Sequence, residues 1–138
     1  MPFTTDALVR FADVDPAGIV FYPRYFEMLN GAVEDWFAQD IGVSFAAMHL
    51  DRRVGVPTVK LEAEFIAASR LGDVLEFAIT PLRLGRSSCT IDVSVNCGGE
   101  PRFRAEVALV CMDLDRHKSA PWPDDMRAGI ERILVPAD

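Results

Sequence analysis

Apolar residues recur at helical spacing in one segment of the chain, residues 23–40. Charged and polar side chains occupy much of the rest of this segment, so the pattern predicts an amphipathic helix with one buried face. The residues on that face are Phe26, Leu29, Val33, Trp36 and Phe37. Gly31 lowers the helix propensity by about 1 kcal/mol relative to alanine. Its presence indicates that another element packs closely against the middle of the helix.

Strand patterns lie on both sides of this helix. A short apolar run predicts a first strand over residues 7–11, and residues 59–66 alternate between apolar and polar as a half-buried strand does. The sequence Leu71-Gly72-Asp73 then interrupts the pattern. Three longer strands are predicted after it, over residues 74–84, 87–97 and 102–114.

The connections between the long strands are short. Gly85-Arg86 and Gly98-Gly99-Glu100 are typical of tight turns, and turns of this length favour an antiparallel meander. Residues 45–53 give no clear pattern. The last part of the chain is interrupted by Pro121, Pro123 and Pro136, with a short helix predicted over residues 124–134.

These elements describe an α+β fold in which one helix packs on the concave side of a curled antiparallel sheet. With 138 residues, half of them apolar, the chain can bury one core and is most simply a single domain over residues 1–138. A net charge of -7 and a pI near 4.8 argue against nucleic acid as the main partner. Small molecules or proteins remain, and a local group of arginines could still bind a phosphate-bearing ligand.

The N-terminus lacks a basic region leading into an apolar stretch, and no window approaches 18 consecutive apolar residues. We therefore expect a cytoplasmic protein with no membrane segment. Cys89, Cys97 and Cys111 form no Cys-x-x-Cys pair. Because Cys89 and Cys111 lie in apolar, strand-like runs, they are expected to be buried reduced thiols.

The loop before the helix carries the candidate chemistry. Pro16 biases Asp15 toward an extended or turn conformation, and Gly18 allows a close turn, so the carboxylate is presented from a loop. Pro23 suits the first helical position, which predicts unpaired amide donors around residues 21–25 at a positive helix end. A carboxylate beside donors for a developing oxyanion is what hydrolysis of an activated acyl group requires.

Simpler interpretations of the same residues stay open. Asp-Pro-x-Gly is also an ordinary turn sequence. Asp13 could raise the pKa of its neighbour, but holding the loop through bonds to backbone amides is the favoured role. Neither His49 nor His117 has the spacing of a metal site, and both are expected to be structural or on the surface, so no metal is predicted.

The motif extends well beyond the aspartate. Residues 11–26 read FADVDPAGIVFYPRYF, which resembles the signature of hotdog-fold acyl-CoA thioesterases of the 4-hydroxybenzoyl-CoA thioesterase type. The order of strand, loop, helix and four strands resembles that family over about residues 5–115. The resemblance implies the hotdog fold, a long central α-helix wrapped by a five-stranded antiparallel sheet. It also implies a homodimer joined edge to edge, commonly paired again into a homotetramer, with active sites at the subunit interface.

The resemblance also assigns roles to residues of the loop and the helix start. It implies that Asp15 is the catalytic carboxylate, as nucleophile or general base, and that the amide around Tyr22 polarises the thioester carbonyl. The substrate-binding residues predicted beside them are Gly18, Ile19, Val20 and Tyr25. Tyr22 and Tyr25 could line the acyl pocket or only pack the helix start. The substrate implied is an aromatic acyl-CoA such as 4-hydroxybenzoyl-CoA, with no cofactor besides the coenzyme A of the substrate.

Cations for the phosphates of coenzyme A are expected at a turn. Arg86 and Ser87 stand where the family places basic residues, with Arg83 nearby, although this chain lacks the larger basic cluster of other members. Arg52 and Arg53 are a second candidate pair. We expect the two remaining strand arginines, Arg102 and Arg104, to project to solvent.

Three alternative functions remain at this point. The enzyme could act on short or branched aliphatic acyl-CoA, or it could be a dehydratase of acyl thioesters, which would normally need a histidine at the site. The fold could also serve as a non-catalytic binding or scaffold protein. Retention of Asp15 beside a helix start counts against the last alternative.

Overall fold

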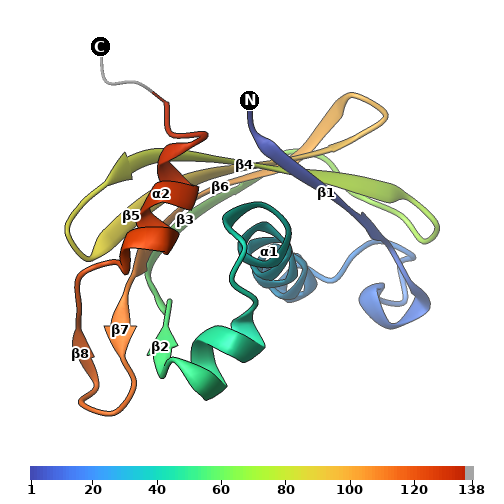
Figure 1. The fold of residues 1–138 in the computed structure, drawn as a ribbon. Coiled ribbons are helices and arrows are strands. Elements are labelled where there is room, and N and C mark those ends of the chain that lie inside the picture. The colour runs from blue at the N-terminus through green and yellow to red at the C-terminus, as the bar shows by residue number, and fades with distance from the viewer. Residues whose placement is uncertain (136–138) are drawn as a thin grey trace.

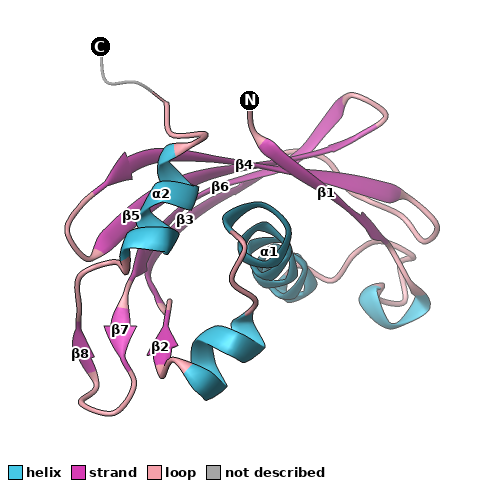
Figure 2. Ribbon diagram, viewed as in Figure 1, coloured by secondary structure: helices cyan, strands magenta, loops and turns pink. Residues whose placement is uncertain are grey.

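Five strands form one antiparallel sheet in the order β1-β4-β5-β6-β3 (Figures 1 and 2). The structure is a computed structural model, and it describes residues 1–135. The strands of this sheet are β1 (Phe3–Leu8), β3 (Thr58–Phe65), β4 (Val74–Leu84), β5 (Ser88–Cys97) and β6 (Glu100–Val110). The predicted antiparallel meander is therefore confirmed for β4, β5 and β6.

The helix predicted after the loop is also confirmed. α1 (Pro23–Trp36) continues into a π-helical turn, η2 (Phe37–Ile41), and ends at Gly42, which has a φ of 94°. The sheet curves over α1, which lies against its concave face (Figure 1). The sequence suggested that Gly31 allows another element to pack closely, and this was wrong. A Cβ added at Gly31 would have nothing within 4 Å in the described part of the chain.

Alternate residues of the central strands face α1 and form the core. Phe77 pairs with Val95, which pairs with Phe103, and all three side chains are almost fully buried. Trp36 and Phe37 fill the other side of this core from α1 and η2, with no exposed surface. The period-2 alternation of these strands thus explains which face of the sheet receives the helix.

The strand β3 differs from its prediction in burial. Its bounds agree with the sequence pattern, yet every residue from Thr58 to Phe65 is exposed, including Val59 at 62% and Phe65 at 51%. The physical reason is its place at the edge of the sheet, because α1 packs chiefly against β1 and β4. The apolar residues of β3 are therefore left uncovered within one chain.

The predicted limits of two strands were wrong. The first strand ends at Leu8, paired with Val74, and Phe11 lies in a short 3₁₀ turn, η1 (Phe11–Asp13), where it is exposed. The last long strand ends at Val110, because the chain then enters a second, three-stranded sheet. That sheet consists of β2 (Val54–Gly55), β7 (Met112–Asp113) and β8 (Lys118–Ser119).

Two short helical segments complete the described chain. The unassigned residues 45–53 contain a π-helical turn, η3 (Ala47–Asp51), and the predicted C-terminal helix is α2 (Asp124–Glu131). An added Cβ on Gly129 of α2 would lie 2.9 Å from the Cα of Ile41, so α2 packs tightly on η2. Pro136 lies outside the described residues. None of the helices over residues 1–135 has both the length and the apolar character that a membrane span requires.

Candidate active site

The loop that carries Asp15 is a tight, hydrogen-bonded turn. The Asp15 amide donates to the Ile19 carbonyl, and its carbonyl accepts the amide of Gly18, both at 2.9 Å. Gly18 has a φ of 80°, a conformation that favours glycine. Asp15 Oδ1 accepts the amide of Ala17 at 2.9 Å, while Oδ2 has no hydrogen-bond partner within residues 1–135. The turn therefore fixes the carboxylate through one oxygen and leaves the other available.

Asp13 holds this loop from its other side. Its Oδ2 accepts the Arg10 amide at 2.8 Å, and its carbonyl accepts the Phe21 amide at 2.9 Å. The structural role favoured for Asp13 is thus confirmed.

One backbone amide at the start of α1 donates no hydrogen bond within residues 1–135. The prediction of several unpaired donors was wrong for Phe21, Arg24 and Tyr25. The Phe21 amide donates to Asp13, as described above, and the amides of Arg24 and Tyr25 donate to the carbonyls of Phe21 and Tyr22. Pro23 has no N–H. The Tyr22 amide has no acceptor among the residues that the structure describes. Tyr22 also has helical dihedral angles, with φ −53° and ψ −35°, so it opens the helix and its N–H lies at the positive end of the dipole.

Tyr22 also lines a cavity of about 300 Å³. The residues that line it are Ile19, Val20, Tyr22, Tyr25, Phe65, Ile66, Ala67 and Ala68. The structure thus brings together four of the predicted site residues and adds the end of β3. Asp15 is not among the lining residues. Its backbone amide donates a hydrogen bond to the carbonyl of Ile19, which connects Asp15 to the cavity wall.

Aromatic rings surround one side of the cavity. The Tyr22 and Phe65 rings meet edge to face at 6.0 Å, and Tyr25 stacks on Phe103 at 4.9 Å with only 5° between the planes. Sequence reasoning missed Phe65, because an apolar residue near the end of an alternating strand is expected in the core and gives no sign that it lines a cavity.

One protein-family model matches most of this chain. The model of the thioesterase-like superfamily matches residues 9–130, which span the loop, α1 and every strand of the five-stranded sheet except β1. The chain belongs to the thioesterase-like superfamily. It is a thioester hydrolase, as the motif predicted.

Individual relatives add detail to this assignment. The chain is 29% identical over 124 residues to a 1,4-dihydroxy-2-naphthoyl-CoA hydrolase of Thermosynechococcus vestitus, covering 89% of this chain and 84% of that protein. Among solved structures, a thioesterase superfamily protein of Jannaschia sp. superposes with a TM-score of 0.90 at 31% identity, covering 99% and 94% of the two chains. A 1,4-dihydroxy-2-naphthoyl-CoA thioesterase of Synechocystis gives 0.85 at 25% identity, covering 94% and 96%.

A buried polar group lies behind the cavity of this thioesterase. The hydroxyl of Tyr25 bonds to Ser69 Oγ at 2.8 Å, and Ser69 has no exposed surface. Arg102 Nη1 donates to Ser69 Oγ at 3.2 Å and to Asp73 Oδ2 at 2.8 Å. The amide of Arg70 and the guanidinium of Arg102, in that order, hold the pKa of Asp73 below its ordinary value.

Arg102 does not project to solvent as the sequence predicted. Its side chain is only 12% exposed, whereas that of Arg104 is 64% exposed and pairs with Asp92, as expected for the outer face. The difference arises from an irregularity in the pairing of β5 and β6, where Val95 opposes Phe103 but Asn96 opposes Pro101. Arg102 is the extra residue, and such a bulge re-aims a side chain.

The structure does not bring Arg86 and Ser87 to the cavity within one chain. They lie in the turn after β4, whereas Asp73 and the cavity lie at the other end of that strand, and eleven residues of strand span about 35 Å. The Arg86 side chain is exposed. The second pair of candidates is engaged elsewhere, Arg52 by Asp125 at 2.8 Å and Arg53 by Asp115 at 3.0 Å.

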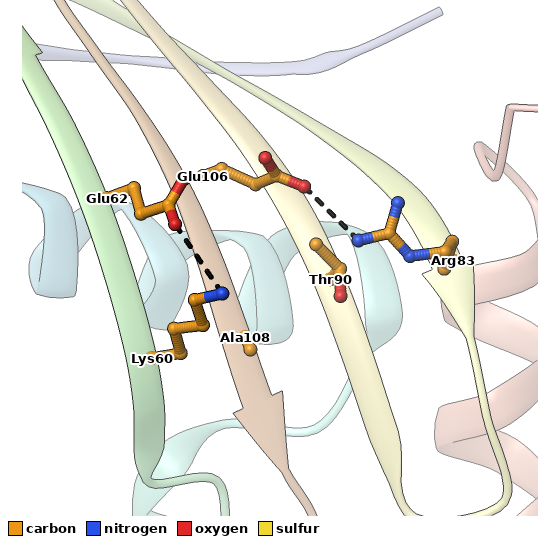
Figure 3. A pocket seen from close by; sticks show the side chains of 6 residues that line it. All are labelled: Lys60, Glu62, Arg83, Thr90, Glu106 and Ala108. Atoms are coloured by element: carbon orange, nitrogen blue, oxygen red, sulfur yellow. Dashed lines mark hydrogen bonds and ion pairs between the residues drawn. The ribbon is translucent and has the colours of Figure 1, made fainter.

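A separate cavity of about 260 Å³ lies on the face of the sheet turned away from α1 (Figure 3). Arg83 and Glu106 are joined there at 3.2 Å, and Lys60 and Glu62 at 3.5 Å. None of the predicted substrate-binding residues lines it. His49, whose Nδ1 lies 2.8 Å from the carbonyl oxygen of Phe45, and the exposed His117 are also absent from the cavity beside Tyr22.

Proposed function

We propose that this thioesterase hydrolyses an aromatic acyl-CoA to the free acid and coenzyme A, with Asp15 as nucleophile or general base. One observation carries the proposal. Tyr22, whose amide lacks an acceptor among the described residues, lines an aromatic cavity together with Ile19, and the Ile19 carbonyl accepts the amide of Asp15. Such a donor can hold the oxyanion of the tetrahedral intermediate.

The chemistry needs few groups because a thioester is already activated. As a nucleophile, Asp15 Oδ2 adds to the carbonyl carbon, the C–S bond breaks, the thiolate leaves, and water then cleaves the mixed anhydride. As a general base, the carboxylate takes a proton from water while the water oxygen adds to the same carbon, and the C–S bond of the resulting tetrahedral intermediate then breaks to release the thiolate and the free acid. In both routes the negative carbonyl oxygen is held by the Tyr22 amide, and Asp15 Oδ1 stays bonded to Ala17.

The ring-lined wall supports an aromatic acyl group. Tyr22, Tyr25 and Phe65 offer faces and edges on which a planar ring can stack. The relatives named 1,4-dihydroxy-2-naphthoyl-CoA hydrolases support a hydroxylated aryl group. Within this class, 4-hydroxybenzoyl-CoA remains a proposed substrate.

The exposed strand β3 supports a homodimer. Eight consecutive residues at a sheet edge, with Val59 and Leu61 on it, expose backbone donors and acceptors that a second copy can pair. Further pairing into a homotetramer would let Arg86 and Ser87 of another copy reach the phosphates of coenzyme A. In this proposal Arg86→Ala raises KM for a CoA ester more than for the matching pantetheine ester, and Arg83→Ala serves as the control.

A thiol-release assay tests the proposal. The parent protein is given aryl-CoA and short or branched aliphatic acyl-CoA esters, and the expected result is a kcat/KM higher for aryl esters by at least about tenfold. Faster turnover of an aliphatic ester would contradict the aromatic substrate class, whereas the assignment as a thioester hydrolase would stand. No turnover of any ester, in a folded protein, would favour a binding or scaffold role.

A further inference from the structure

Arg102 connects the sheet to the connection between β3 and β4. Its carbonyl accepts the amides of Ile66 at 2.9 Å and Ala67 at 3.2 Å. Its side chain turns toward the same connection, where Nη1 also donates to the carbonyl of Ala68 at 3.0 Å. With the bonds to Ser69 and Asp73, one residue of β6 therefore contacts the connection at five points.

The connection in turn holds the loop of Asp15 and the first turn of α1. The carbonyl of Ser69 accepts the Val20 amide at 2.9 Å, and Ile19 forms an antiparallel bridge with Arg70. The hydroxyl of Ser69 bonds to Tyr25. These contacts lie on either side of Tyr22 in the sequence, so the connection sets the position of the proposed oxyanion donor.

The Arg102 contacts are suited to a rigid support. A planar guanidinium has several donors in fixed directions, and its bonds to a carboxylate are charge-assisted. Glu100 Oε1 accepts from Nε at 3.1 Å, so the same group is held on two sides by Glu100 and Asp73. A lysine ammonium in its place is a point charge that cannot reproduce this arrangement.

We propose that Arg102 is a positioning residue for the hydrolysis reaction, which fixes the Asp15 loop and the Tyr22 amide through Ser69 and its neighbours. This inference rests on the function proposed above. Arg102 touches none of the reacting atoms, and its effect is expected on kcat rather than on KM, because a displaced oxyanion donor weakens the transition state more than the bound substrate.

Amide hydrogen exchange tests the structural half without any substrate. In Arg102→Met the Val20 amide should exchange at least about tenfold faster than in the parent, while the amide of Val93 in the core is unchanged. Arg104→Met, two residues along β6 and on the exposed face, is the matched control and should leave Val20 unchanged. Unaltered exchange at Val20 in Arg102→Met would overturn the proposal.

Steady-state kinetics test the other half. Arg102→Met should lower kcat by about 10- to 100-fold with KM within about twofold, and Arg102→Lys should recover part of the loss. A kcat per folded molecule equal to that of Arg104→Met would overturn the proposal even if the melting temperature fell.

If Arg102→Met does not fold, Asp73→Asn, which weakens the same contact, is measured in its place with the same expectations. If the parent hydrolyses no ester, the proposed function fails, whereas the exchange experiment still decides whether Arg102 orders the loop.

Discussion

The Tyr25 and Ser69 hydroxyl groups lie 2.8 Å apart and are both buried, so the first turn of α1 is bonded to a residue 44 positions later in the chain. Removing one partner of a buried hydrogen bond leaves the other partner with one hydrogen bond fewer, and this costs stability. Tyr25→Phe should therefore lower the free energy of unfolding by about 1 kcal/mol.

Tyr22→Phe is the matched control for this prediction. The Tyr22 hydroxyl has no hydrogen-bond partner within residues 1–135, so its loss should change stability by less than about 0.5 kcal/mol. Urea unfolding of the two variants checks this prediction, and equal losses of stability would contradict it.

Gly18 and Gly31 should respond to alanine in opposite directions. An added Cβ meets nothing within 4 Å among the described residues at either position, but only Gly18 has a positive φ. Gly18→Ala should lower the free energy of unfolding by about 1–2 kcal/mol. Gly31→Ala, in the middle of α1, should raise it by up to about 1 kcal/mol. Thermal or urea unfolding measures both, and a stabilised Gly18→Ala would show that the turn does not need its left-handed conformation.

The Asp73 carboxylate should make stability depend on acid pH. The amide of Arg70 and the guanidinium of Arg102 lower its pKa in the folded chain. A group with a lowered folded pKa stabilises the fold above its unfolded pKa, and this contribution is lost as the pH falls through the lower folded value. We expect the melting temperature to decline below about pH 4, and less steeply in Asp73→Asn. The exposed Asp6→Asn should follow the parent, and parallel curves for Asp73→Asn would contradict the assignment. Asp125, whose pKa Arg52 lowers, leaves some acid sensitivity in every variant.

The exposed edge strand should mediate association. Light scattering of the parent should give at least twice the chain mass of 15.3 kDa at micromolar concentration. Placing carboxylates on β3 with Val59→Asp and Leu61→Asp should produce a monomer, since the same charges then meet from both copies. Leu50→Asp is the control, because Leu50 is 74% exposed and lies away from the sheet. A monomeric parent would contradict the proposed dimer.

Local patterns predicted much of the fold and of the loop. The spacing of residues such as Leu29 and Val33 is enough to define α1, and the turns at Gly85 and Gly98 define the meander. The turn of Asp15 also follows from adjacent residues, since Pro16 and Gly18 act on their own neighbourhood.

The features that sequence reasoning missed depend on contacts between distant segments. Arg102 becomes buried because of a pairing irregularity opposite Val95 and Asn96, which no pattern within β6 announces. β3 alternates like a covered strand, yet its burial is decided by where α1 lies on the sheet. Ser69 sits in a run of small residues, and only its partners Tyr25 and Arg102 give it a role.

The central claim is that the Asp15 carboxylate takes part in the reaction. The most direct measurement is kcat for Asp15→Asn on the best ester of the panel, beside the parent and the exposed Asp6→Asn. Because the substitution removes the base or nucleophile at almost unchanged volume, kcat should fall by on the order of 10² or more, with the melting temperature close to that of the parent. A kcat within about twofold of the parent would remove Asp15 from the mechanism and leave it as a turn residue.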